Sequence, residues 1–505
     1  MTAPAETTIE LMLVSHTNVG KTSLLRTLLG RDVGRVADAP DVTLQSAPHE
    51  LARIDGATLR LWDTPGFGDS FRLAARLRRR PAWAAWIVRE VWDRRRNPRL
   101  HRAQQLARDL RARAHVVLYL VDASQTPEEA VHVGPELEAL AWAGKPLLAI
   151  LNQTGMRSDA SEPDSRAARW RTVLEAHPAV GRTVELDSFS RCWVQEIALY
   201  AEVGGLLDAS LHPVYSRLSA GIADAHRQRF SRSMTALADH LAATACDRIE
   251  VGSSVFGALR RFIPWSGAAD LGGQREAFER LTRTCLDGTQ KATLDLLEIN
   301  RISGTHAGEI LEATVRDLTV SQPVDTASSS LLGGVLSGAV TGLAADLMAG
   351  GLTLGTGALV GAVLGGAGAA ALTAGYNRYA EKDRTIIRWS PASLDQTLRS
   401  TVMLYLAVAH FGRGQGEWRH HDTPARWGRE VDAAIARAGE RRDHLWKLAL
   451  DPGRGAEVRT GCETLLRDVV GAVLDRLYPE AGTTFPGSAA SHGEGRTGPD
   501  QSHQG

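Results

Sequence analysis

The sequence feature that most constrains the fold is a short loop between an apolar run and an amphipathic run near the N-terminus. Residues 8–15 (TIELMLVS) are largely apolar, residues 15–22 read SHTNVGKT, and an amphipathic stretch then ends on Gly30. This order predicts a buried strand, a tight loop and a helix. A loop placed in this way directs backbone N–H groups and a helix N-terminus towards one point, which is the geometry that binds phosphate. The alternative is an accidental turn before a helix.

The loop matches the phosphate-binding pattern G-x-x-x-x-G-K-[ST] except at its first position, where Ser15 stands. Gly20 lets the backbone approach phosphate, Lys21 is predicted to reach the β- and γ-phosphates, and the Thr22 hydroxyl is predicted to bind Mg²⁺. Lysine is informative here, because the chain has five lysines and 53 arginines. The loop residues predicted to bind nucleotide are Asn18, Val19, Gly20, Lys21, Thr22 and Ser23.

A second motif, Asp63-Thr64-Pro65-Gly66, follows about 40 residues after the loop, at the end of a predicted strand. A D-x-x-G sequence at this distance predicts that Asp63 holds Mg²⁺ through water and that the Gly66 amide senses the γ-phosphate. Between the motifs, Thr43 is the candidate switch threonine that closes on Mg²⁺, the alternative being an ordinary loop threonine. The predicted catalytic residues are therefore Asn18, Lys21, Thr43 and Gly66, and the predicted metal ligands are Thr22, Thr43 and Asp63.

The chain divides into two regions with different patterns. Strand-like runs at 48–54, 57–63, 115–124, 146–153 and 182–187 alternate with helical segments, and Asp55-Gly56 is a hairpin signal between the first two. We therefore expect a doubly wound α/β domain over residues 1–210. Residues 211–480 show helical spacing throughout, which predicts a mainly helical domain. The polar, Gly/Ser-rich segment 481–505 is expected to be disordered.

Composition sets only broad limits on the number of domains, the partner and the cellular compartment of the protein. The 505 residues are enough for two or three domains, and the 58 basic and 58 acidic side chains cancel, so net charge identifies no partner. The four cysteines lie far apart, without the spacing of a metal or redox pair, and the N-terminus has no basic region followed by an apolar stretch. We therefore expect a cytoplasmic protein.

The motifs together resemble a known family. NVGKTSLLRTLLG (18–30), Thr43, WDTPGFGDS (62–70) and YLVDAS (119–124) are similar to the Era/TrmE branch of the translation-factor-related GTPases. The resemblance covers residues 8 to about 155. AVAHFGRGQGEW (407–418) resembles an uncharacterised bacterial branch with a helical C-terminal domain of unknown function. The resemblance implies a P-loop hydrolase that uses GTP and Mg²⁺.

Three positions bear on mechanism within this resemblance. Asn18 stands where potassium-activated relatives help to coordinate K⁺, and Phe67 replaces the water-orienting glutamine of Ras-like enzymes. Slow intrinsic turnover is therefore expected, with K⁺, a homodimer or a partner completing the site. The guanine-reading N-K-x-D motif is reduced to Asn152-Gln153-Thr154-Gly155. Asn152 remains as a support for the loop, but the loss of the Asp predicts weaker discrimination between GTP and ATP.

A basic insertion is predicted at residues 70–113. Residues 72–113 contain 14 arginines and three acids, with Trp83, Trp86 and Trp92 interleaved. Three interpretations stay open: docking on an anionic membrane, RNA binding through phosphate contacts and stacking, or a helical pair packed on the domain.

Residues 329–376 form a Gly-rich apolar block in which Asp346 is the one charged side chain. Glycines recur every four residues in two runs, which predicts a closely packed helical hairpin, either in a membrane or inside the second domain.

The main hypothesis is a GTP-binding and hydrolysing switch associated with the inner membrane or with a membrane protein. The alternatives are a soluble ribosome- or RNA-associated GTPase and a nucleotide-binding scaffold with negligible hydrolysis.

Overall fold

The computed structural model describes residues 7–17, 19–30, 46–78, 96–153, 166–186, 192–252, 271–302, 376–381, 384–410 and 425–479. Several sequence predictions lie outside these ranges: Asn18, Thr43, the tryptophans of the basic insertion, the Gly-rich block before Tyr376, and the segment 481–505.

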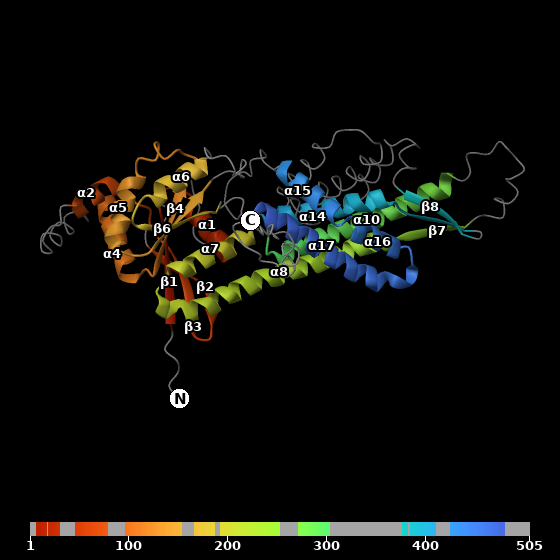
Figure 1. Ribbon diagram of the computed structural model, residues 1–505, viewed down its shortest axis with the longest axis horizontal. Helices are drawn as coiled ribbons and strands as arrows, with labels where there is room; N and C mark the ends of the chain where they lie inside the picture. The colour runs from red at the N-terminus through yellow and green to blue at the C-terminus, as the bar shows by residue number, and fades with distance from the viewer. Residues whose placement is uncertain are drawn as a thin grey trace, which may run out of the picture.

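The N-terminal region is a six-stranded sheet covered by helices (Figure 1), with strand order β2-β3-β1-β4-β5-β6. β2 pairs antiparallel with β3, and all other pairs are parallel. The strands are β1 (Thr7–Ser15), β2 (Ala47–Ile54), β3 (Ala57–Asp63), β4 (Val116–Asp122), β5 (Leu147–Asn152) and β6 (Val180–Glu185). The helices are α1 (Lys21–Leu29), α2 (Ser70–Arg78), α4 (Pro98–Arg113), α5 (Val133–Ala143), α6 (Arg166–Glu175) and α7 (Trp193–Leu206).

The central strands are apolar because both faces of the sheet are covered. Along β4 and β5 almost every residue is buried, as the sequence predicts for parallel strands. One face packs against α1 and α7. The other face packs against α2, α4, α5 and α6. The predicted doubly wound α/β fold is confirmed.

The predicted hairpin between β2 and β3 is also confirmed. Asp55 and Gly56 have φ angles of 47° and 76°, so both central residues of the turn lie in the left-handed region. A two-residue turn of this kind matches the twist of the strands that it joins, which explains the Asp-Gly sequence. The hairpin leaves β2 at the edge of the sheet.

The C-terminal region is mainly helical, but it also contains a small antiparallel sheet with the order β7-β9-β8. Its helices are α8 (His212–Cys246), α10 (Leu271–Ile299), α14 (Pro391–Ala409), α15 (Ala425–Arg437), α16 (Gly439–Leu448) and α17 (Gly455–Leu477). Two single turns of 3₁₀ helix also occur, η1 (Ala209–Leu211) and η3 (Pro452–Arg454). The strands are β7 (Arg248–Gly252), β8 (Tyr376–Glu381) and β9 (Arg384–Trp389).

The predicted mainly helical character of residues 211–480 is confirmed, but the helical spacing of the sequence does not indicate these three strands. β7 pairs with β9 across more than a hundred residues, from Arg248↔Arg388 to Gly252↔Arg384. No local turn signal connects strands so far apart in sequence. Ile387 and Trp389 of β9 are buried in the helical core, so the small sheet is stabilised by the helices around it.

Helix α8 joins the two regions (Figure 1). Near its start, Tyr215 and Leu218 are buried against the sheet, and the helix contacts β2 and β3. Gly221 allows a close approach to the hairpin, because a Cβ atom there would collide with Ile54. Further along, Phe230 and Leu241 lie in the core of the helical region. One helix therefore contributes to both hydrophobic cores.

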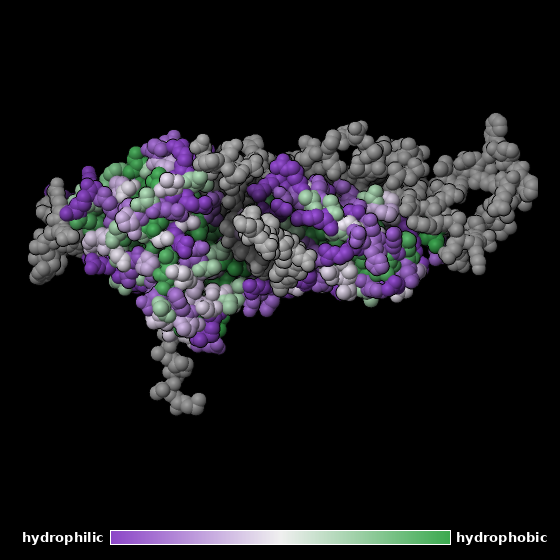
Figure 2. Space-filling view, viewed as in Figure 1, coloured by the Kyte–Doolittle hydropathy of each residue, from purple (hydrophilic) through white to green (hydrophobic). Residues whose placement is uncertain are grey.

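The surface of the helical region is largely polar on the face shown in Figure 2, where hydrophilic residues gather over α15 and around α16. Among the helices that the structure describes, none combines the length and the apolar character needed to cross a membrane.

A substitution in α8 tests this packing. Leu241 is fully buried, so Leu241→Ala removes apolar contacts and leaves a cavity, and we expect it to lower the stability of the helical region by about 2–5 kcal/mol. Differential scanning calorimetry of the full chain measures the change. Leu294→Ala on α10 is the control, because Leu294 is 43% exposed. Equal effects of the two substitutions would contradict the assignment of α8 to the core.

Candidate nucleotide-binding site

The predicted phosphate loop connects β1 directly to α1. Gly20 caps the helix with a φ angle of 92°, a left-handed conformation that favours glycine, and its carbonyl accepts a hydrogen bond from the Leu24 N–H at 2.9 Å. Lys21, Thr22 and Ser23 follow as the first residues of α1. The free N–H groups of a helix N-terminus therefore face the end of the loop, as phosphate binding requires.

Ser15 fills the position of the missing first glycine without strain. It is the last residue of β1, and it is not among the described non-glycine residues with positive φ. Its hydroxyl donates to the His16 carbonyl at 2.6 Å. An extended residue needs no glycine, so the departure from the motif leaves the start of the loop intact.

The Asp63–Gly66 motif lies against the loop because β1 and β3 run parallel, with Leu13 opposite Asp63. The Thr64 hydroxyl donates to the Leu13 carbonyl at 2.7 Å. Gly66 is packed so closely that a Cβ atom there would lie 3.2 Å from the Thr17 nitrogen. Glycine at this position therefore allows the two predicted nucleotide-sensing segments to touch.

The charged side chains at this edge fit a magnesium-bound phosphate. Burial lowers the pKa of the Lys21 ammonium, and the neighbouring Asp63 carboxylate opposes that shift. Asp63 itself is buried. The Thr22 hydroxyl and the Asp63 carboxylate are oxygen donors of the kind that Mg²⁺ prefers, and Lys21 with the α1 N-terminus suits an anion. The groups present at this edge therefore fit both Mg²⁺ and phosphate.

The base side of the site rests on Asn152, at the end of β5. Its side chain is buried, and Nδ2 donates a hydrogen bond to the Val19 carbonyl at 2.7 Å. Asn152 therefore braces the phosphate loop, which is the supporting role that the family resemblance implies. Gln153 follows with a φ angle of 56°. Thr154 and Gly155, where the guanine-reading Asp is absent, lie outside the described ranges.

Phe67 is fully buried in the core between the sheet and α2. Its N–H donates to the Ser15 carbonyl at 3.1 Å. The aromatic ring therefore stabilises the position of the Asp63–Gly66 motif and offers no group that could orient water.

The structure thus brings together the predicted residues Val19, Gly20, Lys21, Thr22, Ser23, Asp63, Gly66 and Asn152. The two other predicted site residues, Asn18 and Thr43, are outside the described part of the chain.

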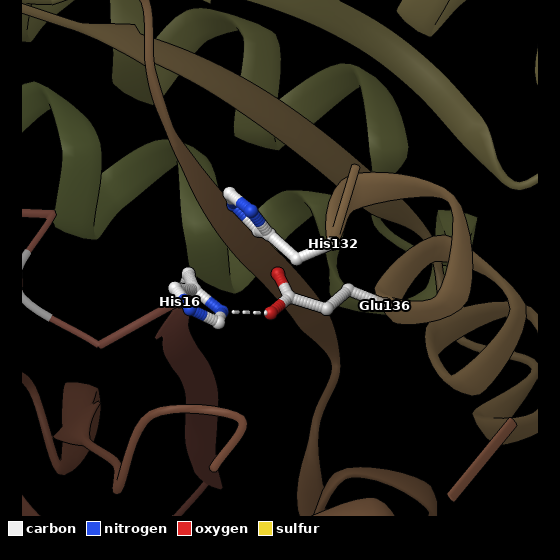
Figure 3. Close-up of side chains that lie close together, drawn as sticks. All are labelled: His16, His132 and Glu136. Carbon is white, nitrogen blue, oxygen red and sulfur yellow. Dashed lines mark hydrogen bonds and ion pairs between the residues drawn. The ribbon is translucent and has the colours of Figure 1, made fainter. Parts of the chain in front are cut away.

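A polar cluster that no sequence motif indicates joins His16 of the loop to the start of α5 (Figure 3). His16 Nδ1 lies 2.6 Å from Glu136 Oε1, and the Tyr119 hydroxyl donates to Glu136 Oε2 at 2.7 Å. The rings of His16 and His132 stack with centroids 3.9 Å apart. Burial raises the pKa of Glu136. Burial, reinforced by His16, lowers the pKa of His132 to about 4.

The local sequence indicates part of this cluster. His132 and Glu136 are four residues apart at the start of α5, a spacing that places two side chains on one helix face. His16 is distant in sequence from both residues, so no local pattern links it to them.

Two protein families match parts of the chain. The family described as "Domain of unknown function (DUF3482)" matches residues 179–452. The family described as "50S ribosome-binding GTPase" matches residues 10–153.

Among curated proteins, the chain is similar to the tRNA modification GTPase MnmE of Nitratidesulfovibrio vulgaris (strain DP4), with 31% identity over 146 residues, 29% of this chain and 25% of the relative. It is 27% identical over 175 residues to MnmE of Azoarcus sp. (strain BH72), which is 35% of this chain and 32% of the relative. The chain therefore spans about a quarter to a third of the length of these relatives.

Among solved structures, the chain is similar to Aquifex aeolicus Era bound to GDP and aluminium fluoride, with a TM-score of 0.27 and 18% identity over 40% of this chain and 57% of the other. A structure of Era with MgGDPNP and part of 16S ribosomal RNA gives a TM-score of 0.27 and 19% identity over the same shares, 40% and 57%.

The close contact at Gly66 can be tested by adding one methyl group. In Gly66→Ala the new Cβ meets the backbone of Thr17 and His16, so either the loop or the motif must shift. We expect affinity for a GTP analogue to fall by roughly 10-fold and affinity for GDP to fall less. Titration with fluorescent analogues measures both. Gly134→Ala on α5 is the control, because nothing lies within 4 Å of its added Cβ. Unchanged GTP affinity in Gly66→Ala would show that the contact does not serve the nucleotide.

Proposed function

Because the chain belongs to the family defined by the domain of unknown function DUF3482 and carries an Era/TrmE-like P-loop GTPase domain, we propose that it is a GTP-binding and GTP-hydrolysing switch. The observation that carries this proposal is the meeting of three segments at one sheet edge. The loop before α1, the Asp63–Gly66 motif and Asn152 are joined there by hydrogen bonds and by the close packing of Gly66.

The proposed roles follow from the chemistry of each side chain. Lys21 and the α1 N-terminus hold the β- and γ-phosphates, and the Gly66 amide contacts the γ-phosphate. Thr22 and Thr43 bind Mg²⁺ directly and Asp63 binds it through water. When bound, Mg²⁺ supplies positive charge that offsets the charge developing on the phosphates. These residues position the nucleotide and stabilise charge, which is most of what phosphoryl transfer asks of a protein.

The buried Phe67 supports the proposal of slow intrinsic turnover. A site without a water-orienting side chain at this position needs help from a monovalent cation, a second copy of the chain or another partner. Activation by K⁺ stays a prediction because it depends on Asn18. Dimerisation stays a prediction as well.

We propose that helix α8 carries a change of nucleotide state to the helical region. The hairpin β2–β3 follows Thr43 in the sequence and ends at Asp63, so both predicted switch segments adjoin it. Helix α8 packs on this hairpin and continues into the second core. We propose a first domain over residues 1–210, with the basic insertion at 70–113, and a second domain over residues 211–480. Helix α8 is then the first α-helix of the second domain, and it lies beside the hairpin. Movement of the switch segments would then change the packing of α8.

The decisive test is Lys21→Ala. Removing the ammonium deletes a charge-assisted contact to phosphate, so we expect GTP affinity to fall by roughly 10- to 100-fold and turnover to disappear. Fluorescent GTP titration and phosphate release measure these effects, and competition by ATP measures base preference. Lys145→Ala is the matched control, since Lys145 lies in the turn before β5. Wild-type affinity in folded Lys21→Ala would exclude the proposed site.

Two cellular settings for this switch are proposed. Membrane association depends on residues 329–376. RNA or ribosome association is the second candidate. It is favoured by three arginines of α4 that line a cavity of about 510 Å³ beside Pro65, namely Arg102, Arg108 and Arg113. Arginines that line one cavity suit nucleic-acid phosphates.

Fractionation of cells separates the two settings. If residues 329–376 direct membrane association, deleting them should move the protein from the membrane pellet to the supernatant, because the two apolar segments are lost. Sedimentation before and after an alkaline carbonate wash measures this change. Recovery of the intact chain with ribosomes, in a salt-sensitive manner, would instead support the second candidate. An intact chain found in neither pool, together with a deletion that unfolds the helical region, would show that residues 329–376 pack inside the protein.

A further inference from the structure

The cluster of His16, His132 and Glu136 combines three groups that bind metal ions. One imidazole nitrogen from each histidine and one carboxylate oxygen of Glu136 all lie within 4.8 Å of one another. The residues come from two structural elements, since His16 belongs to the phosphate loop while His132 and Glu136 lie at the start of α5. Figure 3 shows the three side chains turned towards one another.

The distances are compatible with a tetrahedral ion. Ligand atoms about 2.0–2.1 Å from a zinc ion lie about 3.3 Å apart. The contact from His16 Nδ1 to Glu136 Oε1 is 2.6 Å, shorter than this, and the limit of 4.8 Å for the whole group is longer. A zinc ion here would require the stacked rings of His16 and His132 to rotate so that one nitrogen of each faces the Glu136 carboxylate. The fourth position would remain open to water.

The surroundings hold the carboxylate in place for such a role. Glu136 is fully buried, and a buried carboxylate is costly unless it is paired, hydrogen-bonded or bound to a metal. Tyr119 donates to its second oxygen at 2.7 Å, and the first oxygen faces His16 Nδ1. A hydrogen bond of this kind fixes the orientation of a metal-binding carboxylate. The side chain of His16 is 36% exposed, which gives an ion access from solvent.

We propose that His16, His132 and Glu136 form a binding site for one divalent transition-metal ion of the zinc class. Two imidazoles and one carboxylate are a ligand set that zinc favours, whereas Mg²⁺ prefers oxygen ligands alone. None of its ligands belongs to the proposed magnesium site at Thr22 and Asp63.

An ion in this position ties the phosphate loop to α5. His16 lies between Ser15, which ends β1, and Thr17, whose backbone is packed against Gly66. A bond from His16 to an ion held by α5 would restrict this part of the loop. Metal binding would therefore act on the phosphate loop in addition to nucleotide binding. The inference does not depend on nucleotide hydrolysis, because the cluster contains none of the proposed nucleotide-binding residues.

Zinc binding by the full-length protein tests the proposal. Wild-type protein, His132→Gln and Glu136→Gln are titrated against a chromophoric zinc chelator, without nucleotide. His444→Gln is the matched control, because His444 is an exposed histidine on α16. We expect wild type and His444→Gln to bind one more zinc ion than the two cluster variants, or to bind it at least about 10-fold more tightly.

Two further measurements make the result decisive. Co²⁺ should give the intense visible absorption of a tetrahedral site in wild type and lose it in His132→Gln, and excess Mg²⁺ should not displace it. Tyr119→Phe should weaken zinc binding by about 10-fold without removing a ligand. Equal zinc stoichiometry and affinity in wild type and His132→Gln would overturn the proposal and leave a hydrogen-bonded cluster only. Circular dichroism confirms that each variant is folded, and loss of GTP binding in Lys21→Ala does not affect this result.

Discussion

The parallel pairing of β1 with β3 is the constraint on which the rest of the site depends. Parallel neighbours end at the same edge of a sheet, and the register places Leu13 opposite Asp63. The chain leaves β1 as the phosphate loop and leaves β3 as the Asp63–Gly66 motif, so the two meet. Gly66 then lies against the loop backbone, and Phe67 is anchored in the core below. Asn152 closes the arrangement from the end of β5, two strands away from β1.

Features that depend on local sequence could be predicted well. The strand–loop–helix unit around Gly20 follows from an apolar run, a glycine and an amphipathic run, and the turn at Asp55-Gly56 follows from the residues that tolerate positive φ. The sheet of the helical region could not be predicted in this way. More than a hundred residues, including helix α10, separate β7 from β9 in the sequence, so their pairing is a property of the tertiary structure.

The same distinction applies within the site. Motif spacing identifies Lys21 and Asp63, because each belongs to a short pattern. The contact from Asn152 to the Val19 carbonyl crosses 133 residues, and that from His16 to Glu136 crosses 120. Such contacts depend on strand order, which places β4 between β1 and β5 and brings α5 behind the loop. Contacts between residues so far apart leave no pattern in the local sequence.

The continuity of α8 has a mechanical consequence. A helix of 35 residues is about 50 Å long, and its regular hydrogen bonds make it stiff along that length. The helix is held at one end by the hairpin, where Gly221 approaches Ile54, and at the other by the helical core. It is therefore a lever arm. Over a length of about 50 Å, a tilt of about 5° at the hairpin would carry the far end about 4 Å, which is less than the rise of about 5.4 Å of one helical turn. A shift too small to break the contacts beside the phosphates would be amplified into a displacement that side-chain packing at the opposite end of the molecule must accommodate.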